Sequence, residues 1–155
     1  MTHSLPNRKR PAHHPPIVTP NRPIVIFVTV NVKNQSVRLN NEQMHTALTQ
    51  AWQDARQWRV GDYLIMPDHV HLFCIPGVHY PENIAKWVQY WKGHVRRILK
   101  LKESIWQRDC WDTQIRNINH YNEKLSYMRE NPVRRELVAR NEDWPYQGKI
   151  NIIRW

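Results

Sequence analysis

Two histidines separated by a single residue, His69 and His71, are the side chains of this sequence best suited to bind a metal ion. They lie in an apolar run from 63 to 75 that is interrupted by Pro67-Asp68. Successive side chains of a strand point to opposite faces, so the two imidazoles share a face if this run is a strand. Two adjacent imidazole nitrogens supply half of a divalent-metal site. Paired histidines on strands are also common as hydrogen-bonded surface residues, so the pattern needs partners from elsewhere in the chain.

A helix predicted over residues 117–130 carries the second group of candidate residues. It should stop near Asn131-Pro132, because proline disfavours helical backbone in the residue before it. Residues three or four apart on a helix are neighbours, which places the following polar side chains along one edge: His120, Lys124, Tyr127 and Asn131. The predicted inward stripe is Ile118, Tyr121, Leu125 and Met128. Tyr127 thus has its hydroxyl on the polar side of the helix, but spacing alone favours a structural role, because a tyrosine at a core boundary is common.

The remaining pattern predicts a single α+β domain. Apolar periodicity gives this order: strand 24–30, helix 44–55, strand 58–66, strand 69–75, helix 84–99 and helix 117–130. Asn40 or Asn41 is the expected cap of the first helix, and Pro81-Glu82 suits the start of the second. Strand–helix–strand–strand–helix is the opening of a ferredoxin-like sandwich, an antiparallel sheet with helices packed on one face.

The charge balance indicates a polyanionic partner. The chain has 155 residues, the size of one domain, and 23 Lys and Arg against 13 Asp and Glu give a net charge of +10. Such a surface attracts nucleic acid. Eight Trp and six Tyr could stack on unpaired bases, although most tryptophans are expected in the core.

Basic residues gather in two segments. Residues 1–23 hold six prolines and are predicted to form a flexible basic arm, in which Arg8, Lys9 and Arg10 would contact phosphates. On the helix over 84–99, Lys92 and Arg96 fall off the apolar stripe and make one side basic. Either segment could equally be a solvated surface. The domain is expected to occupy residues 24–147, followed by a tail over 148–155.

Cysteine usage and hydropathy bear on the cellular compartment. Cys74 and Cys110 are far apart and form no CxxC pair, which disfavours both a disulfide framework and a thiolate zinc site. The basic N-terminal cluster has no apolar run behind it, unlike a secretory signal. Apolar stretches are only as long as strands, so no membrane-spanning helix is expected. We therefore expect a soluble cytoplasmic protein.

Several segments together resemble a known enzyme family. The run from Met66 to Leu72 resembles the histidine–hydrophobe–histidine motif of HUH endonucleases, in the context of single-tyrosine transposases of the IS200/IS605 type. The run from Tyr127 to Val133, a tyrosine, three residues and then Asn-Pro-Val, is similar to their nucleophile segment in the REP-associated tyrosine transposase branch. Further similarity lies in Trp106–Asp112, Ile115–Asn117 and Asp143–Tyr146. The resemblance spans roughly the whole predicted domain.

This resemblance implies a metal-dependent DNA transposase. His69 and His71 match the metal-binding histidines, Tyr127 matches the nucleophile, and Asn131 stands where related enzymes place a glutamine as third ligand. The implied cofactor is Mg²⁺ or Mn²⁺. The implied substrate is single-stranded DNA with hairpins (REP/BIME-like palindromes), cleaved through a 5′-phosphotyrosine that permits strand transfer. A monomer is favoured, with a dimer as the alternative, and action at the bacterial nucleoid is expected.

The remaining roles are assigned from position. Arg116, with Lys92 and Arg96, is a candidate for contact with the DNA backbone, and His120 or Lys124 for the tyrosine proton or the phosphate. Three alternatives stay open: a non-catalytic binder of single-stranded nucleic acid, a metal-independent RNA endonuclease using His69 or His71 as acid or base, and structural zinc binding by histidines. The structural zinc site would lack thiolate partners.

Overall fold

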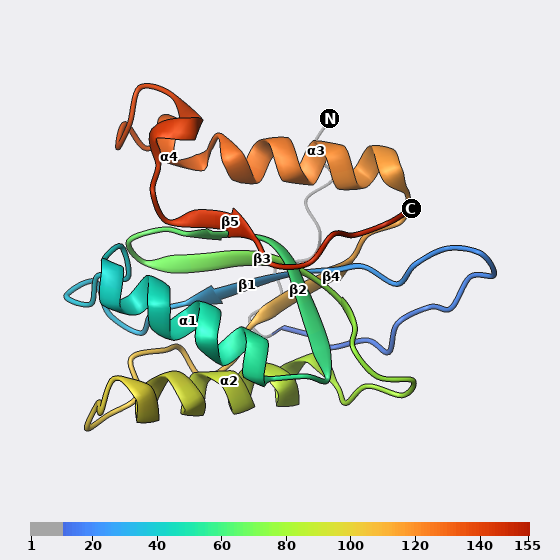
Figure 1. Ribbon diagram of the computed structural model, residues 1–155, viewed down its shortest axis with the longest axis horizontal. Helices are drawn as coiled ribbons and strands as arrows, with labels where there is room; N and C mark the ends of the chain where they lie inside the picture. Colours follow the sequence, from blue (N-terminus) through green and yellow to red (C-terminus); the bar gives the residue numbers. More distant parts are fainter. Residues whose placement is uncertain (1–10) are drawn as a thin grey trace.

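A five-stranded antiparallel sheet forms the centre of the computed structural model, which describes residues 11–155 (Figure 1). The sheet has the order β4-β1-β3-β2-β5 and consists of β1 (Ile26–Asn31), β2 (Trp58–Ile65), β3 (His69–Pro76), β4 (Trp111–Gln114) and β5 (Gln147–Lys149). The helices are α1 (Glu42–Asp54), α2 (Ile84–Ile98), α3 (Ile118–Arg129) and the short α4 (Asn131–Arg134), followed by the 3₁₀ turn η1 (Asn141–Asp143). Arg8, Lys9 and Arg10 lie outside the described residues.

The connections confirm the predicted fold class. The first four strands, in the spatial order 4-1-3-2 with α1 and α2 as connections, make the ferredoxin-like arrangement. Each of the four strand pairings that hold this sheet together is antiparallel. Two strands were not predicted from the sequence. Strand β4 has only four residues and β5 three, too few for a clear alternation of apolar and polar side chains.

Helices cover both faces of the sheet (Figure 1). The prediction that they pack on one face is right for α1 and α2 and wrong for α3, which lies across the opposite face. The physical reason is that the strands present apolar side chains on both sides. Val25, Phe27 and Phe73 point away from α1 and α2 and would be exposed without α3.

Most tryptophans serve the core between the sheet and the first two helices. Five of the eight belong to this cluster: Trp52, Trp58, Trp87, Trp91 and Trp106. Two buried indole groups are satisfied by backbone carbonyls, since Trp87 Nε1 donates to Ala55 and Trp58 Nε1 donates to Glu82, each at 2.8 Å. These aromatic side chains are therefore unavailable for stacking on bases.

Asparagines begin all three long helices. Asn41 accepts a hydrogen bond from the Met44 N–H, which confirms one of the two predicted caps. The second helix begins at Ile84 behind Asn83, and not at Pro81-Glu82, because the Asn83 side chain satisfies the first free N–H groups. Helix α3 begins behind Asn117 as predicted. Its first residue, Ile118, is 44 % exposed, so its predicted inward position is wrong.

The domain is expected to span residues 24–147, and contacts cross both of these limits. The limits themselves stay predictions. Within the predicted arm, the Ile17 backbone exchanges two hydrogen bonds with the Gln114 side chain of β4, at 2.7 and 2.8 Å. At the other end, β5 continues past residue 147 along the edge of β2, and Ile153 packs against the core beneath α3. Among residues 11–155, no helix is both long and apolar enough to traverse a bilayer.

Candidate metal and tyrosine site

The imidazoles of His69 and His71 converge on the α3 face of the sheet. Strand β3 alternates, so Val70 points to the opposite core while both histidines point towards α3, as the spacing predicts. Their Nε2 atoms are 3.1 Å apart, and the ring of His71 stacks on Phe27 of β1 at 5.1 Å. The two nitrogens that could ligate a metal therefore face the same point.

The other nitrogen of each imidazole has a partner of its own. His69 Nδ1 lies 2.8 Å from an oxygen of Asp68, and His71 Nδ1 lies 2.8 Å from the hydroxyl of Thr29, its direct partner on β1. The same Asp68 oxygen accepts a hydrogen bond from Arg135 at 2.7 Å. A carboxylate or hydroxyl on the far nitrogen is the usual support of a metal-binding histidine, because it fixes the ring and its tautomer.

These partners leave the facing nitrogens free to bind a cation. Asp68 accepts the proton of His69 Nδ1, so the neutral ring has a lone pair on Nε2. Thr29 can accept from His71 Nδ1, which leaves a second lone pair opposite the first, or it can donate to that nitrogen. In the first arrangement two lone pairs meet at 3.1 Å and a cation between them relieves the repulsion.

Asn131 completes a donor set that fits a divalent metal. Its amide Nδ2 lies 3.3 Å from His69 Nε2, and a half-turn of the amide presents its oxygen there instead. Two imidazoles and an amide oxygen suit a cation such as Mn²⁺, or Mg²⁺ with water in the remaining positions. The residues brought together by β3 and the start of α4 thus fit the predicted metal.

Burial keeps both histidines neutral. It lowers the pKa of His71 to about 3, helped by the positive charges of Lys124 and Arg134 and by the adjacent His69, whose protonation would oppose that of His71. It lowers the pKa of His69 as well, against the opposing effect of Asp68. Asp68 is itself partly buried, but hydrogen bonds from Arg135 and His69 hold the pKa of its carboxyl below the usual value. A metal ligand must be neutral imidazole, and the site supplies it near pH 7.

Tyr127 lies one helical turn before Asn131 and is 64 % exposed. No hydrogen bond joins its hydroxyl to another group within residues 11–155, so the oxygen is accessible. Arg134 of α4 holds the residue from one side: its guanidinium lies 3.7 Å from the ring centroid and donates to the Tyr127 carbonyl at 2.6 Å. Pro132 has no N–H with which to continue the hydrogen-bond ladder of α3, so a separate short helix begins at Asn131, and Arg134 of this helix lies over the tyrosine.

Tyr121, the competing aromatic, is a structural residue. It is buried, and its hydroxyl donates to Asp62 of β2 at 2.7 Å. Burial, together with that hydrogen bond, raises the pKa of Tyr121. Arg129 donates to the other oxygen of Asp62 at 3.1 Å, so the two residues fix α3 on the sheet.

The two predicted helpers lie at different distances from the site. Lys124 is one turn before Tyr127, and its ammonium lies 5.3 Å from the Phe27 ring on which His71 stacks. His120 is about 10 Å from Tyr127 along the axis of α3 by helical rise, and it accepts a hydrogen bond from the Arg116 N–H at the helix start. Lys124 is therefore the nearer candidate.

Of the two predicted DNA contacts on α2, the one at Lys92 needs correction. Lys92 is only 5 % exposed, and its ammonium donates to the Gln107 carbonyl at 2.9 Å, so it is not part of an open basic face. Arg96 is exposed and donates to the carbonyls of Leu101 and Lys102 beyond the helix end, and its contact with DNA stays a prediction. The spacing of residues along α2 could not predict that the loop before β4 packs over Lys92. Arg116 is exposed, at the far end of α3 from Tyr127.

Four residues of the site were not found from the sequence: Thr29, Asp68, Arg134 and Arg135. Asp68 directly precedes the first histidine, and Thr29 is the polar exception in an apolar strand, so both carried a local signal. The arginines follow the Asn-Pro-Val segment but contact the site only through the turn into α4. The apolar periodicity of the sequence does not predict the turn between α3 and α4, so the positions of these arginines could not be predicted.

Comparison with known proteins finds similarity to tyrosine transposases, in agreement with the geometry of the site. No protein-family model matches the chain. The REP-associated tyrosine transposase of Escherichia coli K12 is 27 % identical over 125 residues, which cover 77 % of this chain and 73 % of the relative. A second relative, from Haemophilus influenzae, carries the same name as a provisional assignment and is 34 % identical over 100 residues, 54 % of each chain. Over most of its length this chain is therefore similar to a REP-associated tyrosine transposase.

The fold of this chain agrees with that of a solved structure. A REP-associated tyrosine transposase bound to a REP hairpin superposes with a TM-score of 0.72 at 23 % identity. The match covers 89 % of this chain and 81 % of that one. A match of this extent supports the α+β architecture described above.

Proposed function

We propose that this protein cleaves and rejoins single-stranded DNA beside hairpin-forming, REP-like sequences, with Tyr127 as nucleophile and a divalent metal as cofactor. One observation carries the proposal. Two imidazole nitrogens 3.1 Å apart meet the Asn131 amide one helical turn from an accessible tyrosine. A metal site beside a nucleophile is the minimum for this chemistry.

The metal would be held by His69, His71 and Asn131. Held there, Mg²⁺ or Mn²⁺ would supply charge neutralisation at the scissile phosphate and polarisation of its phosphorus–oxygen bonds. Asp68 and Thr29 keep the two rings oriented, so the ligand geometry exists before substrate arrives.

The covalent step exchanges one phosphoester bond for another. The Tyr127 hydroxyl oxygen attacks phosphorus, the bond from phosphorus to the 3′-oxygen breaks, and a 5′-phosphotyrosine and a free 3′-hydroxyl result. The phenol gives up one proton and the departing 3′-oxygen gains one. Because the new ester conserves the energy of the old one, a 3′-hydroxyl can later reverse the attack and join strands without a nucleotide cofactor.

Two cations are positioned to assist. Arg134 lies over the Tyr127 ring, so an incoming phosphate meets its guanidinium, which can donate two hydrogen bonds at once. Lys124, on the same edge of α3, could stabilise the departing charge or take part in proton transfer. His120 would serve only if the substrate bridged the distance along the helix.

An exposed tryptophan continues the site across the sheet. Trp111 of β4 is the direct partner of Thr29, which in turn is the direct partner of His71, so the three side chains share one face in one row. Two strand spacings separate Trp111 from His71, about 10 Å. Trp111 is 42 % exposed, and we infer that an unpaired base stacks on it while its backbone crosses the histidines.

The DNA partner follows from charge and homology. The net charge of +10 favours a polyanion, and the solved transposase of the same fold is bound to a REP hairpin. Arg116 at the start of α3 and the basic cluster Arg8-Lys9-Arg10 are proposed to contact the hairpin backbone. A single chain carries the histidines, Asn131 and Tyr127, so a monomer suffices, and we place its action in the cytoplasm at the nucleoid.

A single gel tests the nucleophile. The full chain is incubated with a labelled single-stranded hairpin oligonucleotide and Mn²⁺, and products are separated under denaturing conditions. A labelled protein–DNA adduct is expected with the parent chain and with Tyr90→Phe, an exposed tyrosine of α2 on the other face. Tyr127→Phe should lose both the adduct and the nicked product. Adduct formation by Tyr127→Phe would disprove the assignment.

The same assay separates the alternatives. A non-catalytic binder shifts the oligonucleotide on a native gel but forms no adduct with the parent chain. A metal-independent RNA endonuclease cleaves only a strand with 2′-hydroxyls, releases free fragments and keeps its activity in EDTA.

A further inference from the structure

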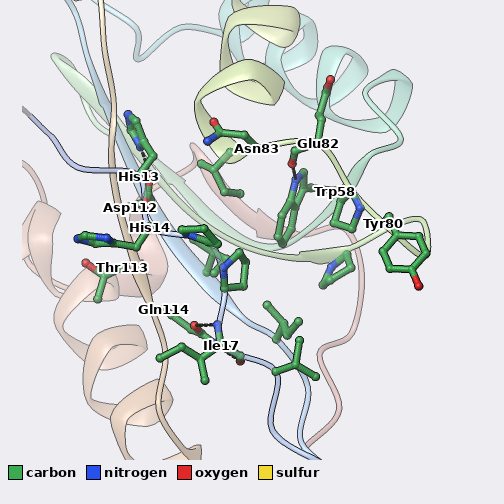
Figure 2. A pocket seen from close by; sticks show the side chains of 18 of the residues that line it. His13, His14, Ile17, Trp58, Tyr80, Glu82, Asn83, Asp112, Thr113 and Gln114 are labelled. Carbon is green, nitrogen blue, oxygen red and sulfur yellow. Dashed lines mark hydrogen bonds and ion pairs between the residues drawn. The ribbon is translucent and has the colours of Figure 1, made fainter.

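A second cluster of metal-ligating side chains lies at the outer edge of β4, on the face opposite His69 and His71. It consists of His13, Cys110 and Asp112, whose candidate ligand atoms all lie within 4.8 Å of one another. Asp112 is the direct partner of Val28, and both Val28 and Cys110 belong to the core beneath α1 and α2. Figure 2 shows His13 beside Asp112, where the N-terminal segment crosses the strand.

The chemical types of these side chains fit zinc better than a hard cation. A thiolate, an imidazole and a carboxylate are the three ligand types that Zn²⁺ takes in proteins, whereas Mg²⁺ avoids sulfur. Cys110 is 1 % exposed, and its sulfur takes part in no hydrogen bond among residues 11–155. The Cys110 thiol lies within reach of an imidazole and a carboxylate and forms no hydrogen bond among the described residues. Once deprotonated, it can therefore ligate a metal together with these two side chains.

We propose that His13, Cys110 and Asp112 bind a zinc ion that fastens the N-terminal strap, residues 12–18, to the edge strand β4. The sequence argued against a thiolate zinc site because the cysteines form no pair. That argument misses this cluster because His13 lies about a hundred residues before its partners and reaches them only in the folded chain.

Asp109 supports the proposal as an outer partner. Its carboxylate lies 2.7 Å from His13 Nε2, while His13 Nδ1 contacts Asp112. A histidine that offers one nitrogen to a metal and donates the other N–H to a carboxylate is the common arrangement around zinc. Here Nδ1 would ligate and Nε2–H would donate to Asp109.

The charges balance when zinc is bound. Zn²⁺ with a Cys110 thiolate and an Asp112 carboxylate is neutral, and Asp109 is offset by the buried ammonium of Lys92 nearby. Binding must displace the thiol proton and any proton shared by His13 with Asp112. Without metal, burial raises the pKa of Cys110 to about 12, so the free thiol is neutral and chemically inert.

The strap has a structural consequence at the same edge. Residues 12–18 form one wall of a cavity of about 930 Å³, whose other walls include Trp58, Tyr80 and Gln114 (Figure 2). Only His13 and the Ile17–Gln114 hydrogen bonds tie this wall to β4 by polar contacts among the described residues. A zinc ion at His13 would therefore hold the cavity closed on that side.

Cobalt is the probe that distinguishes this site from the one at His69 and His71. The full chain carrying His69→Ala and His71→Ala is titrated with Co²⁺, and thiolate coordination is read from its sulfur-to-cobalt absorption band in the near ultraviolet. One equivalent should produce the band, and Zn²⁺ should abolish it. Because the DNA-nicking ligands are absent, the result does not depend on the proposed function.

Matched variants complete the test. Cys110→Ala should lose the band, while Cys74→Ala, the other buried cysteine, should keep it. His13→Ala should weaken Co²⁺ binding by about tenfold or more, and its exposed neighbour His14→Ala should leave binding unchanged. A parent chain that is folded by circular dichroism yet shows no band would overturn the proposal. So would equal affinities of the His13→Ala and His14→Ala chains, which remain informative if Cys110→Ala fails to fold.

Discussion

The two faces of the sheet are built from the same strands but carry different kinds of side chain. On the α1 and α2 face, β3 presents Val70, Leu72 and Cys74 to a tryptophan-rich core. On the α3 face the same strand presents His69 and His71. A buried polar group costs free energy unless it is hydrogen-bonded, so a protein places such groups under a helix only where they have a use.

The polar groups differ in how they are satisfied. On the α3 face Asp62 is 2 % exposed yet accepts hydrogen bonds from Tyr121 and Arg129, and each histidine has a partner on its far nitrogen. On the other face, the indole nitrogens of Trp52 and Trp91 have no partner within residues 11–155. One face is organised by hydrogen bonds that orient chemistry, and the other by apolar contact, where a lost indole hydrogen bond is tolerated.

The largest effect is expected from a substitution on the α3 face, and it concerns the rate of DNA nicking. His71→Ala removes a metal ligand, whose charge stabilisation in the transition state amounts to several kcal/mol, so nicking should fall by about a thousandfold or more. His94→Ala, on α2 and paired with Asp54, should nick at the parental rate. Nicking rates with Mn²⁺ measure both. A similar loss in the two variants would show that histidine removal damages the protein in general.

The opposite face should respond in stability and not in chemistry. Trp91→Ala empties a fully buried site packed against Trp52 and Trp106 and should lower the free energy of unfolding by about 3–5 kcal/mol. Urea unfolding measures it. At a temperature where the variant is still folded, its nicking rate should stay near the parental one. A Trp91→Ala protein as stable as the parent would contradict the description of this face as the main core.

A side chain that orients one of the histidines can be changed while both histidines are kept. Thr29→Val keeps the shape of the strand and deletes the hydroxyl beside His71 Nδ1. Loss of such an outer partner typically weakens metal affinity by about 10- to 100-fold. Titration of Mn²⁺ against nicking rate should show this shift, with the rate at saturating Mn²⁺ recovering towards the parental value. An unchanged Mn²⁺ requirement would show that Thr29 does not orient the ring.

The sequence predicted the parts of the site that local periodicity determines. The spacing of His69 and His71 sufficed for a shared face, and Asn117 for the start of α3. Lys92 shows where this reasoning fails. It lies off the apolar stripe of its own helix, but the loop before β4 covers it, and that packing involves residues distant in the chain. The contact between His13 and Asp112 could not be predicted for the same reason, because only the folded strap brings the two residues together.

The smallest expected effect concerns the edge of the α3 face. Trp111→Ala removes a ring that shares a row with Thr29 and His71 but touches neither metal nor nucleophile. Stacking of one base contributes about 1–3 kcal/mol, and the lower end suits a ring that stays partly covered, so affinity for a single strand should fall about fivefold. Tyr90→Ala, an exposed aromatic on α2, should bind as the parent does. Fluorescence anisotropy with a labelled single strand in EDTA isolates this contact from the chemistry. Equal affinities of the two variants would confine the substrate to the α3 end of the site and leave β4 outside its path.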